Sequence, residues 1–249
     1  MIIDFHARLH PGLLSGMDAA GIDRAAVSAG GLIGLDRLSV HLTEGGRAEV
    51  KAANDDVYDH CARSAGRLLP VYFADPVRDL RSYTSDAREF CGLELSPAVH
   101  GFRLDDPRVA DLLLVAAEVR HFVYVVTVGR AGAQARDLAR LAGAHPSLTF
   151  VWGHCGHTGL DFLGLTEVSP VPNVMAELSC CLTVTARAAV DRLGVSRVLF
   201  GTEAPLQDPG VELAKIAALD LSPRDRHAVL AGNAGRVLRL GPAQPHPPS

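Results

Sequence analysis

Several features that would place a chain in a special class are scarce in this sequence. Its five cysteines, Cys61, Cys91, Cys155, Cys180 and Cys181, form no CxxC pair, and their number is odd. A chain of 249 residues can bury a sizeable core without disulfide bonds. We therefore expect reduced thiols and a cytoplasmic location.

The sequence also lacks strong charge and long apolar runs. The formal net charge is −4, which excludes a nucleic-acid or membrane partner attracted by bulk charge. Only Lys51 and Lys215 among the 24 basic residues are lysines, so arginine is the default cation and no single arginine is notable by type alone. No apolar stretch is long enough to span a membrane. The first apolar run stops at Asp4 without a basic segment before it, so we expect no secretory signal.

What the sequence does contain is an alternation of short β-branched runs with Ala-, Leu- and Arg-rich stretches of helical periodicity. The alternation predicts parallel strands covered by helices, and the strand count favours one (β/α)8 TIM barrel over residues 1–240 rather than an open doubly wound sheet. The expected strands are 2–5, 25–29, 68–73, 98–104, 122–128, 148–153, 173–178 and 197–201.

Two segments stand outside this pattern. Residues 32–53 form a poorly patterned insert that would rise over the catalytic face, so it is either a lid or a plain surface loop. Residues 241–249, GPAQPHPPS, are proline-rich, and we expect a disordered tail.

Polar side chains collect where the predicted strands end, which is where barrel enzymes carry their active sites. His6 and Arg8 are two residues apart and would share one face of the first strand. The residues at these ends are Asp4, His6, Arg8, His10, His100, Arg103, His154, Cys155, His157, Glu177, Ser179, Cys180, Cys181 and Glu203.

Four segments, in order, resemble the amidohydrolase superfamily, in its branch of small barrel decarboxylases, hydratases and lactonases. They are MIIDFHARLHP at the first strand, FVWGHCG at the sixth, RVLFGTEAPL at the eighth and AGNAGRVLRL in the closing helix. In metal-dependent members, two first-strand histidines, a fifth-strand histidine and an eighth-strand aspartate hold the metal. The resemblance implies the barrel and a site at the carboxyl ends of its strands.

The chain departs from that pattern at three of the four ligand positions, where it has Arg8, Thr127 and Glu203. Arginine stays protonated and cannot ligate a metal. We therefore expect a degenerate metal site and no cofactor, with the Arg8 guanidinium replacing the charge of the metal and pairing with Glu203. Some lactonases of this branch are metal-independent.

On this basis the leading expectation is metal-independent hydrolysis of a lactone or related ester or amide of a small carboxylated molecule. Glu203 would be the general base, and His154 and His6 would shuttle protons or polarise the carbonyl. Arg8 and Arg103 would hold the carboxylate and the oxyanion. Thr127, His10, His157 and Glu177 are further candidates for substrate contact, with Glu177 also a second acid/base candidate.

Other interpretations stay open. A zinc-dependent hydrolase or decarboxylase could use His6, His154 and Glu203 as rearranged ligands. A lyase or cyclase of a biosynthetic pathway and a non-catalytic small-molecule-binding barrel are the remaining alternatives, and a homodimer is possible. Arg103 could instead pair with Asp105 or Asp106 on the surface, and the cysteines near the site read better as core residues than as nucleophiles.

Overall fold

The structure, a computed structural model, describes residues 1–240, and their strands form one eight-stranded parallel sheet in the order β1 to β8. Backbone hydrogen bonds from Phe5 N to Phe200 O (2.9 Å) and from Arg8 N to Ala204 O (2.8 Å) join β1 to the segment that follows β8. The predicted (β/α)8 barrel is therefore confirmed. The strands are β1 (Ile3–Arg8), β2 (Arg24–Ser28), β3 (Leu68–Ala74), β4 (Gly92–Leu95), β5 (Phe122–Val125), β6 (Phe150–Trp152), β7 (Val174–Glu177) and β8 (Val198–Leu199).

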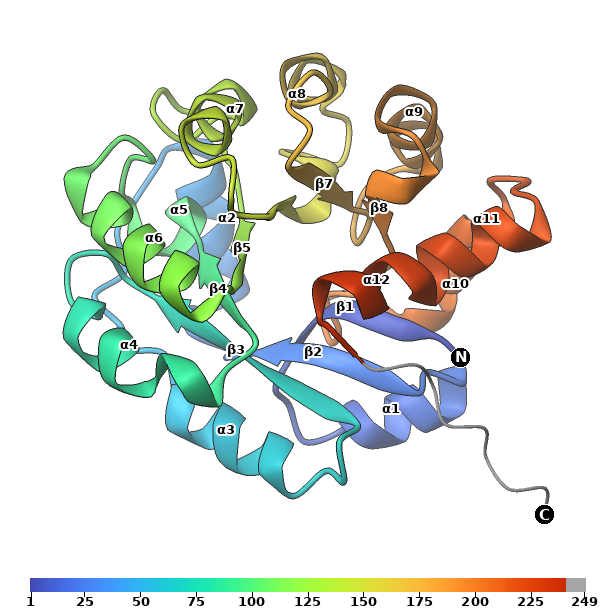
Figure 1. Ribbon diagram of the computed structural model, residues 1–249, viewed down its shortest axis with the longest axis horizontal. Coiled ribbons are helices and arrows are strands. Elements are labelled where there is room, and N and C mark those ends of the chain that lie inside the picture. Colours follow the sequence, from blue (N-terminus) through green and yellow to red (C-terminus); the bar gives the residue numbers. More distant parts are fainter. Residues whose placement is uncertain (241–249) are drawn as a thin grey trace.

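Helices surround the strands (Figure 1). Local signals set their ends: Asp106 accepts a hydrogen bond from Arg108 N at the start of α6, and Pro107 occupies its first turn. The helices are α1 (Leu13–Ala20), α2 (Leu35–Thr43), α3 (Asn54–Ala62), α4 (Leu80–Asp86), α5 (Pro97–His100), α6 (Pro107–Val119), α7 (Ala135–Ala144), α8 (Phe162–Val168), α9 (Thr183–Leu193), α10 (Pro209–Ala217), α11 (Pro223–His227) and α12 (Asn233–Val237).

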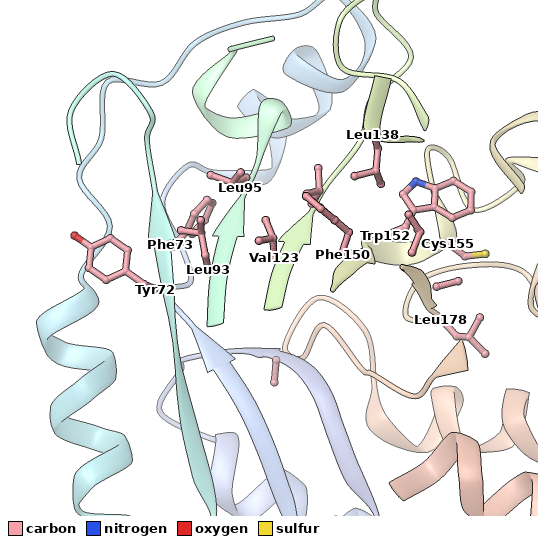
Figure 2. Close-up of a cluster of buried hydrophobic side chains, with 14 of the residues drawn as sticks. Tyr72, Phe73, Leu93, Leu95, Val123, Leu138, Phe150, Trp152, Cys155 and Leu178 are labelled. Atoms are coloured by element: carbon pink, nitrogen blue, oxygen red, sulfur yellow. The ribbon is translucent and has the colours of Figure 1, made fainter. Parts of the chain in front are cut away.

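The hydrophobic core has two parts, because buried parallel strands present apolar residues to both faces. One cluster lies between strands and helices, where Phe150, Trp152 and Leu138 pack together (Figure 2). The other includes Phe5 and Tyr124, which belong to strands on opposite sides of the barrel. The framework that carries the strand ends is thus packed from both faces.

The fourth strand is not where the sequence pattern predicts it. The run 98–104 is the short helix α5 followed by a loop, and the strand is the preceding segment Gly92–Leu95. Pro97 occupies the first turn of α5, and Gly101 ends it in the left-handed conformation with φ 66°. The correction moves a different residue, Glu94, onto the inner face of the barrel.

The segment 32–53 contains a helix, α2, which the sequence pattern did not predict. Residues 241–249, where a disordered tail is expected, lie outside the described residues. Across residues 1–240, every helix is too short or too polar to cross a membrane.

Candidate active site

His6 and Arg8 on β1 meet two glutamates inside the barrel mouth. Arg8 Nε donates to Glu203 Oε1 over 2.9 Å, and Arg8 Nη1 lies 2.8 Å from Glu94 Oε1. His6 Nε2 lies 3.2 Å from Glu94 Oε2, and His6 Nδ1 contacts Glu203 Oε2. The structure thus brings together Arg8 and Glu203, as expected, and adds Glu94, which the misplaced fourth strand concealed.

The four side chains hold one another in the charged state. Burial opposes protonation of His6, but Glu203 and Glu94 outweigh it and raise its pKa to about 10. Burial also opposes ionisation of Glu94, yet Arg8 and His6 prevail and lower its pKa to about 2. The same two cations hold the pKa of the Glu203 carboxyl well below its usual range against the effect of burial. The cluster therefore contains two anions and two cations at neutral pH, and a metal ion bound at His6 Nδ1 would have to displace the proton on that nitrogen.

Tyr124 and Glu94 fix the His6 ring. The Tyr124 ring stacks on it with centroids 3.9 Å apart and an interplanar angle of 6°. Because the Glu94 carboxylate can only accept, it keeps the proton on His6 Nε2, so Nδ1 is the nitrogen that faces Glu203. A histidine tied to a carboxylate through one nitrogen presents the other to a ligand in a defined direction.

His154 follows β6 in a backbone turn with φ 58°, and a chain of hydrogen bonds orients it. Ser179 Oγ donates to Glu177 Oε2 over 2.8 Å, so the same hydroxyl accepts from His154 Nδ1, also at 2.8 Å. The lone pair of His154 is thereby assigned to Nε2. Burial lowers the pKa of His154, which favours this neutral form.

Glu177 is a positioning residue in this geometry rather than the acid/base candidate that its buried strand suggested. Besides Ser179 Oγ, it accepts hydrogen bonds from Tyr124 Oη (2.7 Å), His154 N (3.1 Å) and Ser179 N (2.5 Å). A Cβ at position 201 would approach Glu177 Oε1 to 2.3 Å, so Gly201 is required beside it. With its oxygens occupied, Glu177 fixes the backbone and side chains around His154.

The remaining candidates are divided between the cavity and the surface. Thr127 and His157 line the main cavity, and Thr127 Oγ1 accepts a hydrogen bond from Trp152 Nε1 over 2.8 Å. His10 instead lies beside a separate cavity of about 240 Å³. Arg103 lies on the surface with its side chain 58% exposed, paired with Asp105 at 2.7 Å. Arg103 is not among the residues that line the main cavity, so this position does not support its expected role in holding substrate.

The cysteines near the site are not activated nucleophiles. Cys155 and Cys181 are buried in the core, as expected. Cys180 lines the cavity, but burial, and then the nearby carboxylates of Glu203 and Glu177, raise the pKa of its thiol. A thiol held in the protonated form is a poor nucleophile.

A cavity of about 760 Å³ opens above these residues. Arg8, His154 and Glu203 form part of its wall, and α2 and α5 form another part. This volume is within the range of roughly 300–1,000 Å³ that small-molecule sites occupy. The carboxyl ends of the strands therefore enclose a site large enough for a small organic substrate.

The donor set fits a divalent cation. His6, His154 and Glu203 each offer one ligand atom within 4.8 Å of the others. Among residues 1–240, the buried atoms His6 Nδ1 and Glu203 Oε2 make no well-formed hydrogen bond and face each other directly. Arg8 occupies the other oxygen of Glu203, and three nitrogen or oxygen ligands with room for a fourth are a common catalytic arrangement.

The family model for amidohydrolases, Amidohydro_2, matches residues 3–240, so the chain belongs to this family. No curated protein matches it by sequence. An uncharacterised TIM-barrel protein from Bordetella bronchiseptica has 19% identity and a TM-score of 0.74, covering 96% of this chain and 98% of that one. The 2,6-dihydroxybenzoate decarboxylase from Rhizobium has 16% identity and a TM-score of 0.67, covering 96% and 98% of the two chains.

A third similar structure bears on the cofactor. The 5-carboxyvanillate decarboxylase from Novosphingobium aromaticivorans, complexed with manganese and 4-hydroxy-3-methoxy-5-nitrobenzoic acid, has 20% identity and a TM-score of 0.70. It covers 93% of this chain and 80% of that one. Manganese in such a neighbour contradicts the expectation that this chain works without a cofactor. The presence of Arg8 alone did not justify the expectation of a metal-free enzyme, because His6, His154 and Glu203 still form a cluster of candidate ligands.

Proposed function

We propose that this amidohydrolase is a divalent-metal-dependent decarboxylase of a small carboxylated aromatic molecule. The observation that carries the proposal is the cluster of His6, His154 and Glu203, whose ligand atoms lie within 4.8 Å of one another. His154 and Glu203 line the cavity of about 760 Å³, and so does Arg8, which has a free donor. Two of the similar structures are decarboxylases named for such acids, 2,6-dihydroxybenzoate and 5-carboxyvanillate. This favours decarboxylation over the lactone hydrolysis expected from the sequence.

The free donor belongs to Arg8. Its Nε and Nη1 bind Glu203, Glu94, Ser28 and the Ala29 carbonyl. Arg8 Nη2 makes no hydrogen bond within residues 1–240, and Arg8 lines the cavity. A guanidinium N–H pointing into a partly desolvated site is well suited to a substrate carboxylate.

His6, His154 and Glu203 would hold the metal ion. Bound there, the ion supplies a Lewis acid for oxygen atoms of the substrate. Glu94 keeps His6 Nδ1 directed toward the ligand position, and Ser179 does the same for His154 Nε2. Arg8 holds the carboxylate in place and keeps Glu94 and Glu203 ionised.

In the reaction, the bond between the ring carbon and the carboxylate breaks and carbon dioxide leaves. The electron pair of that bond stays on the ring carbon, which takes a proton from water, so the aromatic acid anion and water give the decarboxylated ring, carbon dioxide and hydroxide. The segment 32–53 contributes α2 to the cavity wall, so we propose that it covers the bound substrate.

The test is carbon dioxide release from 2,6-dihydroxybenzoate and 5-carboxyvanillate by protein loaded with Mn²⁺ or Zn²⁺. We expect turnover that stops on chelation and is lost in Glu203→Gln and His6→Asn. Glu118→Gln and His60→Asn, on exposed side chains, are the matched controls. Carbon dioxide release that persists in the chelated, metal-free protein would contradict the proposal. So would absence of turnover of any aromatic acid in a broad panel, which would favour a non-catalytic binding barrel.

A further inference from the structure

A second arginine lines the same cavity without an acidic partner. Arg130 follows β5, and its Nη2 donates to the Pro97 carbonyl over 2.5 Å. Its Nη1 lies over Gly45, since a Cβ at that glycine would come within 3.2 Å of it. Within residues 1–240 no carboxylate comes within ion-pair distance of Arg130, in contrast to Arg8.

The other charged groups on the cavity wall do not neutralise the positive charge of Arg130. Glu203 is committed to Arg8 and His6. Glu44 lines the cavity but is exposed to solvent and forms no ion pair with Arg130. Burial lowers the pKa of the Arg130 guanidinium, which reflects a cation that has lost water without gaining an anion. A ligand with a negative group at this position would supply the missing partner.

Arg8 ends β1 and Arg130 lies five residues beyond β5, and these two strands are four apart in the eight-stranded sequential order. The wall of the cavity that both arginines line also carries the apolar side chains of Leu38, Leu42, Val126 and Val128. Two separated cations joined by an apolar wall match a molecule with an anionic group at each end of an apolar body.

We propose that Arg130 is a specificity-determining residue that binds a second anionic group of the substrate, which is therefore an aromatic dianion rather than a simple monoacid. The proposal rests on the proposed function for the identity of the reacting end. At the end of the substrate away from the reacting carboxylate, the second group is a carboxylate or a similarly charged group, and the free N–H donors of Arg130 bind it.

The experiment compares ligand pairs that differ in one charge. Terephthalate and biphenyl-4,4′-dicarboxylate are titrated calorimetrically into Mn²⁺-loaded protein, each against its monomethyl ester. We expect one dianion to bind about tenfold or more tightly than its ester, as a charge-assisted hydrogen bond would give. Arg130→Met should remove that preference and leave the affinity for the ester unchanged, and Arg130→Lys should retain part of it. Arg103→Met, which removes an exposed arginine outside the cavity, is the control.

Equal affinity of the wild-type protein for both dianions and their esters would overturn the inference without any variant. An equal loss for dianion and ester in Arg130→Met would do the same, because it would indicate a structural role beside Pro97. Carbon dioxide release is measured separately. If dianions bind more tightly than esters through Arg130 but no substrate is decarboxylated, the proposed function is contradicted and the second anion site stands. If substrate is decarboxylated but Arg130→Met changes neither turnover nor the preference for dianions, only the second anion site is contradicted.

Discussion

The contact between His6 Nε2 and Glu94 Oε2, 3.2 Å long and fully buried, decides which imidazole nitrogen faces Glu203. It also places a second carboxylate against Arg8. The site is thus organised by a glutamate that lines no part of the cavity and acts through its two neighbours.

Glu94→Gln is expected to weaken metal binding by about 10–100-fold, the usual effect of losing a partner that orients a ligating histidine. The amide can still accept from His6 Nε2, but it lacks the charge that strengthens His6 and balances Arg8. Mn²⁺ affinity measured by chelator competition checks this, with Glu118→Gln as the exposed control. An unchanged affinity would mean that Glu94 serves only the fold.

Ser179→Ala is expected to lower kcat for carbon dioxide release by about 10–100-fold, because His154 Nδ1 loses the acceptor that fixes its tautomer. Ser169→Ala, at the end of α8, is the matched control. If Ser179→Ala reduces the free energy of unfolding but leaves kcat at the wild-type value, the hydroxyl does not act through His154.

Arg8→Met should destabilise the metal-free protein by about 3–5 kcal/mol, because it leaves two buried carboxylates with His6 as the remaining cation of the cluster. Urea unfolding in the presence of chelator measures this change. Arg103→Met removes an exposed ion pair and should cost no more than about 1 kcal/mol. Similar losses for both variants would show that Arg8 does not hold the charge balance of the site.

A separate buried histidine should make the fold sensitive to acid. Tyr83 Oη donates to His121 Nδ1 and His121 Nε2 donates to the Phe90 carbonyl, both over 2.8 Å. Burial lowers the pKa of His121 from 6.5 to about 4. Below pH 6.5 the unfolded chain therefore binds a proton at His121 that the folded protein does not bind. The contribution of His121 to the free energy of unfolding falls as pH drops from 6.5 to about 4.

His121→Gln can keep both hydrogen bonds without titrating, so it should flatten this part of the stability profile. The difference should be on the order of 3 kcal/mol across the interval. Urea unfolding at a series of pH values measures it, with the exposed His60→Gln as control. Parallel profiles for wild type and His121→Gln would rule out His121 as the source of the acid sensitivity.

The barrel was predictable because its strands are apolar runs separated by helical periodicity, which is a local signal. The fourth strand was missed for an equally local reason. Ala98, Val99 and Phe102 look like strand residues, whereas β4 has a glutamate in the middle of only four residues. Pro97 at the start of that run was the available signal for a helix instead.

His6, Arg8, His154 and Glu203 could be proposed from the sequence because they lie in or just after strands, in segments that resemble a known family. Their partners could not, because a hydrogen bond such as that from His154 Nδ1 to Ser179 Oγ depends on the register between β6 and β7. Arg130 carried no signal at all in a chain where nearly every cation is arginine. Its lack of an acidic partner is a property of the folded protein.

The measurement that tests the central claim most directly is the metal content of the protein, by elemental mass spectrometry after dialysis against Mn²⁺ and removal of free ion. The account predicts about one ion per chain in the wild type and a large loss in a His6→Asn, Glu203→Gln double variant that remains folded. A wild-type protein that retains no divalent ion, or a double variant that retains it fully, would contradict the assignment of His6, His154 and Glu203 as the metal site.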